Sequence, residues 1–430
     1  LTINEYNIIE KLGEGAFSKV YSGKKEGTSD PEYAIKVQSN QSNSKKTVFE
    51  TFQNEISVHS KLSHKHIVKF IDARLKGSMV KASTKQERER AFIVTEKCTG
   101  GDLFDQILKA QGFSENLTRK YFRQAVSAVE YMHNAGYAHQ DLKVENMMLD
   151  SACNLKICDF GFATAEREVQ RRVGTQGYMA PEQLQRENHD PKVSDIFSLG
   201  VILFIMRTAC FPFRAAIDSD DAWSFIEDGE LERYWEVQKG FNIAGEEGFS
   251  ESFIDLLNKL FSPDPKERPS ISDIKSHEFF KGPLPSDEQV LAELKISPRE
   301  LLRPSALLKP VKPELSSGSA NTATSCNSDC KSPILTKFFI YSKESVDQIK
   351  TKLADTVAQK GKCFIAKTKP KVKLNEPDIE IAFQVDEITE RVKRIRVQLI
   401  KGKDSSKFVK ISEEVQTMMN GEDHLRAISN

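Results

Sequence analysis

The pattern of apolar and polar positions divides the chain into three regions. In residues 1–281, short apolar segments alternate with Gly and Pro, as in a globular domain. In residues 282–332 this periodicity is lost, and a Pro-rich stretch leads into the polar run SSGSANTATSCNSDCKS. Apolar periodicity returns from Pro333. We therefore predict a globular domain over residues 6–280, a flexible linker over 282–332 and a second, small domain over 333–420.

Several segments of the first region have the periodicity of strands or helices. Apolar residues alternate on both sides of a Gly-rich turn in YNIIEKLGEGAFSKVYSG, which predicts two strands joined by that turn. YAIKV predicts a third strand, and FETFQNEISVHSKL has the spacing of a helix. The apolar run Phe197–Met206 is about half as long as the ~20 residues that cross a bilayer, so we predict no membrane span.

The last region is predicted to be a mixture of strands and helices. FFIY predicts a short strand, and apolar residues recur at helical spacing in SKESVDQIKTKLADTV. Alternation over Ile379–Val385 and over Ile395–Leu399 predicts two more strands, and SKFVKISEEVQTMM predicts a final helix. These elements indicate a small α+β domain.

Composition and charge exclude some classes of protein. The 62 Lys and Arg balance the 62 Asp and Glu, so no global basic field indicates nucleic-acid binding. The seven cysteines, an odd number, favour reduced thiols inside a cell over a disulfide framework. Cys326 and Cys330 form a lone pair, which does not predict a zinc site. The chain begins with Leu1, so the true start is expected to lie elsewhere.

Charge is distributed unevenly between the body and the tail. Residues 333–430 contain 19 Lys and Arg against 14 Asp and Glu, a surplus of five positive charges. Because the whole chain is neutral, residues 1–332 carry five net negative charges. Opposite charge would favour docking of the two parts on each other.

The first candidate chemistry is phosphate binding near the N-terminus. Gly13 and Gly15 have no side chains, so their backbone can approach a triphosphate closely, although most such pairs are ordinary turns. Lys36 lies in an apolar strand, where its ammonium needs a partner, and Glu55 in the following helical segment can provide one. The alternative is a solvated lysine and a surface glutamate.

A second cluster, in YAHQDLKVENMMLD and LKICDFGFAT, is suited to phosphoryl transfer. Asn146 and Asp159 would give hard oxygen ligands for Mg²⁺ if they converge. Asp141 could accept the proton of an acceptor hydroxyl, and Lys143 would offset charge on the moving phosphoryl group.

Five segments stand in order along the chain: GEGAFSKV, YAIK, HQDLKVEN, DFG and APE. Together they resemble the motif set of the eukaryotic protein kinases, over roughly Tyr6–Phe280. The resemblance implies a two-lobed α+β protein kinase fold, with an N-lobe β-sheet and helix and a mostly helical C-lobe. It also implies ATP and Mg²⁺ as cofactors and protein substrates.

The resemblance assigns roles residue by residue. Asp141, Lys143, Asn146 and Thr175 would be catalytic, and the metal would be held by Asn146 and Asp159. The residues implied to bind ATP are Leu12, Gly13, Glu14, Gly15, Ala16, Phe17, Ser18, Lys19, Val20, Ala34, Lys36, Glu55, Thr95, Glu96, Cys98, Met148 and Asp159. Three implied supports are Asp195 bracing the catalytic loop, Glu182 paired with Arg268, and His139 and Phe160 packed internally. A charge-rich insert before the hinge, RLKGSMVKASTKQERER, is interpreted as a solvated hairpin extension.

Specificity for serine and threonine follows from the same resemblance. Lys143 in DLKVEN, and Thr175 bridging the catalytic aspartate and lysine, are typical of serine/threonine kinases. Asp102 and Glu145 match positions that bind an upstream arginine of the substrate in basophilic relatives, whereas Ile205 replaces a further acidic position. We therefore predict a preference for one upstream basic residue; the alternative is that both carboxylates are solvated surface groups.

One departure from the family pattern is informative. Gln140 stands where the family has an arginine that binds a phosphate on the activation segment. Between Gly161 and Gly174 the only hydroxyl is Thr164, too close to DFG for the usual phosphorylation point. We predict an activation segment that needs no phosphate. The competing hypothesis is a pseudokinase scaffold, which the presence of all the reacting groups disfavours.

The tail resembles the kinase-associated C-terminal domain of calmodulin-dependent-like kinases of the AMP-activated, calcineurin-B-like-interacting and checkpoint effector types. This implies a regulatory domain, and leaves open whether it binds the kinase domain, lipid or another protein. Four alternating lysines, Lys367, Lys369, Lys371 and Lys373, predict either contact with an anionic membrane or a solvated strand face, with Pro370 interrupting regular pairing. The expected location is cytoplasmic, with nuclear or peripheral membrane sites as alternatives.

Overall fold

The computed structural model describes residues 1–14, 18–28, 32–39, 45–81, 86–239 and 248–295, and the strands of residues 337–401. The chain divides into two compact units. One contains residues 1–229 and 249–331, and the other contains residues 230–248 and 332–430. Each unit is described by itself.

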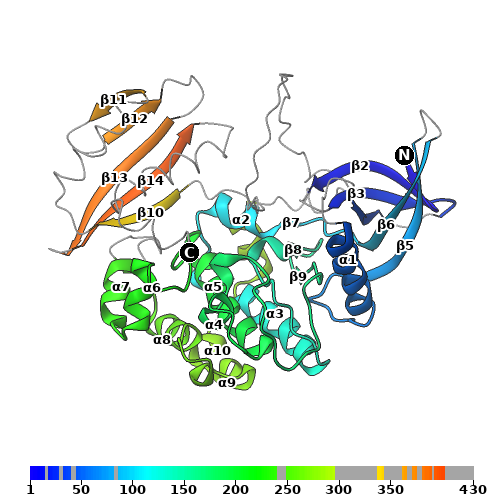
Figure 1. Ribbon diagram of the computed structural model, residues 1–430. Coiled ribbons are helices and arrows are strands. Elements are labelled where there is room, and N and C mark those ends of the chain that lie inside the picture. Colours follow the sequence, from blue (N-terminus) through cyan, green and yellow to red (C-terminus); the bar gives the residue numbers. More distant parts are fainter. Residues whose placement is uncertain are drawn as a thin grey trace. The chain divides into compact units, whose positions relative to one another are not determined.

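The N-terminal lobe of the first unit is a closed, antiparallel β-barrel with one helix (Figure 1). Its strands pair in the order β1-β2-β3-β4-β6-β5. Their bounds are β1 Thr2–Ile3, β2 Tyr6–Glu14, β3 Ser18–Lys25, β4 Tyr33–Gln38, β5 Phe70–Lys81 and β6 Gln86–Glu96, and the helix is α1 Lys45–His59. The strands and the helix predicted in this part of the chain are confirmed.

Two apolar clusters fix this lobe. One fills the barrel with Ile3, Tyr6, Ile35, Val37, Phe92 and Val94. The other seats α1, through Phe52, on Ala91 and Ile93 of β6. Successive side chains of a strand point to opposite faces. Phe92 and Val94 of β6 therefore face the barrel core, and Ala91 and Ile93 face α1.

Strand β1 lies before the predicted start of the domain at Tyr6. Ile3 is fully buried, and β1 pairs with both β2 and β5. Strand β1 is therefore part of this lobe. A strand of two residues has no periodicity that could predict it from the sequence. The charge-rich insert forms the outer ends of β5 and β6, which pair from Gly77 with Arg90 to Lys81 with Gln86. The predicted hairpin extension is confirmed.

The second lobe is mostly helical and contains a small three-stranded sheet in the order β7-β8-β9, where β7 is Gly101–Asp102. Its elements are α2 Leu103–Ala110, α3 Glu115–Asn134, η1 Val144–Asn146, β8 Met147–Leu149, β9 Leu155–Ile157, η2 Gln176–Tyr178, α4 Pro181–Leu184, α5 Pro191–Thr208, α6 Asp221–Glu227, α8 Glu251–Leu260, η3 Pro265–Glu267, α9 Ile271–Ser276, α10 Glu278–Lys281 and α11 Asp287–Glu293. Helix α7 (Leu231–Lys239) belongs to the second unit.

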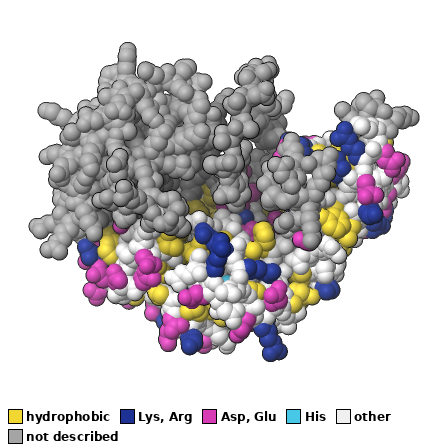
Figure 2. Space-filling view, in the orientation of Figure 1, with side chains coloured by type: hydrophobic (Ala, Val, Ile, Leu, Met, Phe, Trp, Pro, Cys, Tyr) yellow, Lys and Arg dark blue, Asp and Glu magenta, His cyan; other side chains and the backbone are white. Residues whose placement is uncertain are grey.

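The longest apolar run of the chain is the centre of this lobe. Residues Phe197–Met206 lie in α5, where they are buried almost completely. Asp190 caps the helix, and Pro191 occupies its first turn, where a missing N–H is tolerated. Among the described residues, we find no helix with the length and apolarity to cross a bilayer. In the view of Figure 2, basic and acidic side chains are interspersed over the surface that is coloured by type.

The first part of the predicted linker is folded. Helix α11 begins with a capping box of Ser286 and Gln289, and Val290 and Leu294 are buried. Glu293 accepts hydrogen bonds from the backbone N–H and the hydroxyl of Ser114, at 2.6 and 2.8 Å. The prediction of a linker from residue 282 was therefore wrong up to residue 295. The rest of the predicted linker, with Cys326 and Cys330, lies outside the described residues.

The second unit contains a five-stranded antiparallel sheet in the order β10-β14-β13-β12-β11 (Figure 1). The strands are β10 Lys337–Ser342, β11 Gly361–Ile365, β12 Pro370–Leu374, β13 Glu380–Thr389 and β14 Val392–Lys401. Strands β10, β13 and β14 lie where strands were predicted from FFIY and from the two alternating segments. The two helices predicted in this region, and Lys367 and Lys369, lie outside the described residues. Lys371 and Lys373 are in β12, which begins at Pro370.

Candidate active site

Lys36 is placed by the barrel and neutralised from two sides. It lies in β4, in register with Val20 of β3 and Ile93 of β6. Its ammonium donates to both oxygens of Glu55 at 2.9 and 2.8 Å and to Asp159 at 3.0 Å. The predicted pairing of Lys36 with Glu55 is confirmed. Burial would lower the pKa of Lys36, but the Asp159 and Glu55 carboxylates outweigh it and raise that pKa.

The two carboxylates of this network differ in their environment. Burial raises the pKa of Glu55 to about 7, although Lys36 opposes the shift. Burial also acts to raise the pKa of Asp159, but Lys36 outweighs it and the pKa is lowered. The Asp159 side chain is 43% exposed, and that of Glu55 is 4% exposed. Asp159 is therefore the ionised, accessible member of the pair.

The catalytic loop is held by a carboxylate beneath it. Asp195 of α5, 1% exposed, accepts from the backbone N–H of His139 at 2.8 Å and of Gln140 at 2.9 Å. Gln140 has a φ of 63°, a left-handed conformation that is costly for residues other than glycine. Two charge-assisted hydrogen bonds offset that cost. The predicted bracing role of Asp195 is confirmed.

Asp141, Lys143 and Thr175 form a closed triangle of hydrogen bonds. Lys143 donates to Asp141 Oδ2 at 2.7 Å and to Thr175 Oγ1 at 2.8 Å. Thr175 donates to Asp141 Oδ1 at 2.8 Å. Burial would lower the pKa of Lys143, but Asp141 raises it, so Lys143 stays charged. The predicted bridge by Thr175 is confirmed.

Gly174 allows the chain to pass close to the catalytic loop, so that Thr175 can reach Asp141. It has a φ of 103°, and a Cβ at this position would lie 2.5 Å from the carbonyl oxygen of Gln140. Only glycine tolerates both the dihedral angle and the close approach. The chain after Gly174 can therefore bring Thr175 against Asp141.

Asn146 and Asp159 offer the oxygen ligands expected of a magnesium site. Asn146 Nδ2 donates to the carbonyl oxygen of Asp141 at 2.9 Å, which leaves its amide oxygen as the ligand atom. The backbone N–H of Cys158 donates to Asn146 O at 2.9 Å, which links the two ligand-bearing segments. No group of three or more His, Cys, Asp or Glu in the described residues is arranged to hold a metal ion. Two hard ligands completed by phosphate oxygens and water fit Mg²⁺, which keeps part of its coordination shell outside the protein.

Phe160, next to Asp159, is packed internally as predicted. Its ring lies 5.3 Å from that of His139 and 4.6 Å from that of His59, and it is fully buried. Burial lowers the pKa of His59 to about 4, so this ring is neutral near neutral pH. The packing turns Asp159, whose φ is 66°, toward Lys36.

The predicted ATP-binding residues of the Gly-rich segment lie on two paired strands. Leu12, Gly13 and Glu14 end β2, and Ser18, Lys19 and Val20 begin β3, with Gly13 in register with Val20. Gly15, Ala16 and Phe17 lie outside the described residues. Glu14 is bonded to Lys11 and Lys19, and these ion pairs lower its pKa to about 2.

The predicted adenine-site residues come from three strands and the hinge. Ala34 of β4 is in register with Thr95 of β6, and Met148 of β8 with Asp102 of β7. The backbone N–H of Glu96, the last residue of β6, donates to Lys69 O at 3.0 Å. Cys98 follows in the hinge and is buried, which raises the pKa of its thiol to about 12.

Asp102 and Glu145, the predicted substrate acids, are only partly exposed. Asp102 caps α2, accepting from the N–H of Phe104 at 2.7 Å, and burial raises its pKa to about 7. Tyr178 donates to Glu145 at 2.8 Å, and burial raises the pKa of Glu145. Both carboxylates therefore have hydrogen-bond partners within the protein. Ile205 is fully buried in α5.

Glu182 and Arg268 form the predicted structural ion pair. The two guanidinium nitrogens donate to the two carboxylate oxygens at 2.7 and 2.8 Å, and the Ser194 hydroxyl donates to the same carboxylate at 2.9 Å. Burial would raise the pKa of Glu182, but Arg268 lowers it. The pair ties the end of the activation segment to the helical lobe.

Sequence reasoning missed a buried cluster at the hinge. Lys97 is 4% exposed and donates to Glu32 at 2.6 Å and to Ser22 at 3.2 Å. It links the hinge to β3 and to the segment before β4. The available signal was a lysine between Glu96 and Cys98, the two residues predicted to contact adenine, but its partner Glu32 lies 65 residues away.

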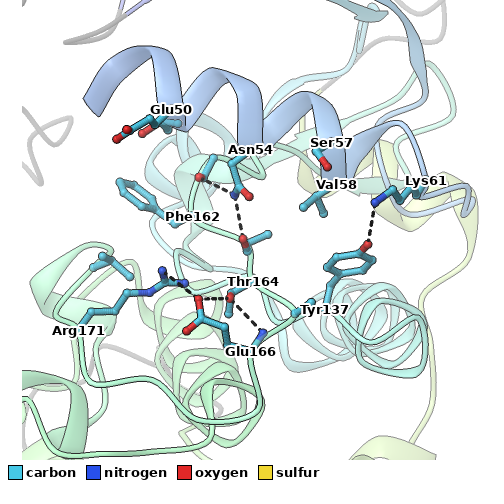
Figure 3. Close-up of a pocket in the computed structure, with 15 residues that line it drawn as sticks. Glu50, Asn54, Ser57, Val58, Lys61, Tyr137, Phe162, Thr164, Glu166 and Arg171 are labelled. Atoms are coloured by element: carbon cyan, nitrogen blue, oxygen red, sulfur yellow. Dashed lines mark hydrogen bonds and ion pairs between the residues drawn. The ribbon is translucent and has the colours of Figure 1, made fainter. Parts of the chain in front are cut away.

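A second missed feature is a cavity of about 650 Å³ beside α1. Figure 3 shows Asn54, Ser57 and Val58 of α1, with Lys61 in the turn after it, on one side. On the other side are Phe162, Thr164, Glu166 and Arg171 of the activation segment. Asn54 donates to the carbonyl oxygens of Gly161 and Ala163 at 3.0 and 2.8 Å. Helix α1 is thus bonded to the start of the activation segment.

Comparison with known proteins agrees with this geometry. Residues 6–280 match the family model described as the protein kinase domain. The serine/threonine-protein kinase SRK2A of Physcomitrium patens is 35% identical over 249 residues, which cover 57% of this chain and 66% of that kinase. CBL-interacting protein kinase 32 of Oryza sativa subsp. japonica is 31% identical over 65% of this chain and 59% of its own. CBL-interacting serine/threonine-protein kinase 8 of Arabidopsis thaliana is 31% identical over 65% and 58%. The alignments span less than two thirds of each relative.

Proposed function

The chain belongs to the protein kinase family, and from that membership we propose that it is an ATP-dependent serine/threonine protein kinase. The observation that carries the proposal is the completeness of the reacting set. The Lys36–Glu55–Asp159 network and the Asp141–Lys143–Thr175 triangle are both formed. A scaffold that had lost catalysis would have no need of either arrangement, and the pseudokinase alternative is not favoured.

In the proposed reaction, the acceptor serine or threonine hydroxyl lies against Asp141. Asp141 accepts the hydroxyl proton as the oxygen forms its bond to the γ-phosphorus, and the bond from that phosphorus to the bridging oxygen of ADP breaks. Lys143, kept charged by Asp141, offsets the negative charge on the transferred group. Lys36 positions the α and β phosphates, and Glu55 fixes the direction of Lys36.

The nucleotide would be held between the lobes by the ATP-binding residues named above. Asn146 and Asp159 would hold Mg²⁺, which neutralises phosphate charge when it is bound. Asp159 suits this role because its carboxylate is ionised and accessible.

We also propose a basophilic substrate preference. Glu145 is close enough to contribute to the raised pKa of Asp102. In the described residues, neither carboxylate has a basic side chain hydrogen-bonded to it. A substrate arginine would supply the missing positive charge.

The proposed activation segment functions without phosphate. Thr164 is buried and bonded to Glu166, which supports its exclusion as a phosphorylation point. Phosphatase treatment of the active protein should leave its turnover unchanged. Loss of activity together with an essential phosphate on residues 161–175 in mass spectra would contradict the proposal.

The C-terminal part is proposed to regulate the kinase domain, supported by its opposite net charge. Truncation after residue 332 should raise activity, and unchanged activity would count against docking. The same proposal includes contact of the tail lysines with anionic lipid and binding of a further protein partner. It also includes a cytoplasmic location. Cys98, Cys153, Cys158 and Cys210 are free thiols.

The primary test is transfer of γ-phosphate to a serine peptide with arginine three residues before the acceptor. Asp141→Asn should reduce kcat by about 10²–10⁴-fold, because general-base catalysis is lost. Asp228→Asn, at an exposed site in the same lobe, is the matched control and should leave kcat unchanged. Equal rates for wild type and Asp141→Asn would favour the scaffold.

A further inference from the structure

The activation segment is tied directly to the catalytic loop through one arginine. Arg171 donates from Nη2 and Nε to Gln140 Oε1, at 2.8 and 3.2 Å. Its Nη1 lies 3.6 Å from Glu166 of the same segment, the pair that is seen in Figure 3 at the edge of the cavity. Two N–H groups of one guanidinium on a single oxygen fix the orientation of the arginine as well as its position.

The acceptor of this bond is itself rigid. Gln140 is 5% exposed, and its backbone N–H is held by Asp195 of the buried helix α5. It directly precedes Asp141. The position of Arg171 is therefore set by the same backbone that carries the proposed catalytic carboxylate.

A second tie follows within four residues of the first. Gly174 passes against the carbonyl oxygen of Gln140, and Thr175 bonds to Asp141. Residues 171–175 are thus fixed to residues 140 and 141 at both ends. Without the first tie, the segment would keep the backbone pairing of Val169 with His189 and the bonds of Thr175 to Asp141 and Lys143.

The polarity of the first tie is the reverse of a phosphate clamp. A clamp places a cation on the loop and an anion, the phosphate, on the segment. Here the loop supplies a neutral acceptor, Gln140, and the segment supplies the cation, Arg171. The segment is therefore ordered by a charge that is always present.

We propose that Arg171 is a positioning residue that orders the activation segment through Gln140 and so holds Thr175 on Asp141. This inference rests on the proposed function and names the device behind its independence of phosphate. Arg171 touches no reacting atom, so its effect is expected in kcat rather than in the KM for ATP.

The first test compares two neighbouring arginines. Arg171→Ala should lower kcat about tenfold, with the KM for ATP unchanged, because a hydrogen bond from a charged donor to a buried acceptor is lost. Arg172→Ala is the matched control: Arg172 is exposed and bonds only Gln176 among the described residues, at 3.1 Å, so kcat should stay within twofold of wild type. Arg171→Lys should be intermediate, since an ammonium cannot make the two-pronged bond. Equal kcat for the Arg171 and Arg172 variants would overturn the proposal.

The second test exchanges the polarity of the tie. Gln140→Arg alone places two cations together and should lower kcat at least as much as Arg171→Ala. Arg171→Glu alone removes the donor and should do the same. The double variant Gln140→Arg/Arg171→Glu restores an ion pair and should recover kcat to within about threefold of wild type. A double variant as slow as the product of the two single effects would overturn the proposal.

Hydrogen exchange separates this inference from the proposed function. In the full chain, Arg171→Ala should increase amide exchange over residues 165–175, and Arg172→Ala should not. If wild type transfers no phosphate to any peptide but only the Arg171 variant loosens the segment, the proposed function fails and the tie stands. If wild type is active and both variants exchange alike, the tie fails and the function stands.

Discussion

Two buried ion pairs in this kinase domain each join a basic side chain to a glutamate, but their charges are balanced to different extents. Arg268 and Glu182 are 1% and 4% exposed, and their charges balance one to one. Arg268 also donates to the carbonyl oxygen of Ser262 at 3.0 Å and packs over the ring of Phe197. Everything this pair needs is supplied by the protein.

The pair of Lys36 and Glu55 is open by contrast. Lys36 is 22% exposed and shares its single positive charge between Glu55 and Asp159. Two carboxylates against one ammonium leave one negative charge over, on the accessible Asp159. An ion pair whose charges balance within the protein supports the fold. An ion pair with an unbalanced negative charge can bind a positively charged ligand.

The largest effect is expected from breaking the pair of Arg268 and Glu182. Arg268→Met should lower the free energy of unfolding by about 3–5 kcal/mol, because it leaves Glu182 buried and ionised without a partner. Chemical denaturation measures this, with Arg167→Met at an exposed site as control. A loss below 1 kcal/mol would show that the two pairs do not differ as described.

The next largest effect is expected from breaking the pair of Lys36 and Glu55. Lys36→Met should lower kcat by about 10²–10³-fold, since a preorganised charge at the phosphates is removed. The free energy of unfolding should change less than in Arg268→Met, because Glu55, with a pKa of about 7, can take up a proton and stay neutral. Lys24→Met, exposed on β3, is the control for both measurements. A stability loss equal to that of Arg268→Met would contradict this account.

The smallest effect extends the comparison to the proposed substrate acids. Burial holds the pKa of Asp102 at about 7, so the carboxylate is mostly neutral at pH 6 and mostly ionised at pH 8. The KM for an arginine-containing peptide should therefore fall by up to about tenfold from pH 6 to pH 8. A peptide with alanine in place of that arginine is the control and should show no such fall. Asp102→Asn should abolish the dependence, and an unchanged pH profile in that variant would count against Asp102.

Contacts that depend on a recognised motif could be predicted from the sequence. Lys36 with Glu55, Glu182 with Arg268, and Thr175 with Asp141 each join segments far apart in the chain, and no periodicity connects them. The motif order supplied these pairs. Strands such as β4 and the helix α1 could be predicted independently, because their apolar spacing is regular.

Features without motif or periodicity could not be predicted. Strand β1 has two residues, and its burial depends on pairing with β5 almost 80 residues later. The bond from Arg171 to Gln140 depends on the path of the whole activation segment. Helix α11 is a different case, because the capping signal Ser286 to Gln289 was readable, but the polar composition around it was taken as a linker.

The pairing of β1 has a consequence for the charge-rich hairpin. Asn4 donates to Ser78 O at 2.8 Å and accepts from the N–H of Ser78 at 2.7 Å, next to the rungs that join β1 to β5. These bonds hold the hairpin of β5 and β6 to the N-terminal strand partway along its length. The hairpin and the barrel therefore move as one rigid unit. A spectroscopic label on the exposed side of the hairpin, for instance at Glu87, would therefore report the orientation of the whole barrel.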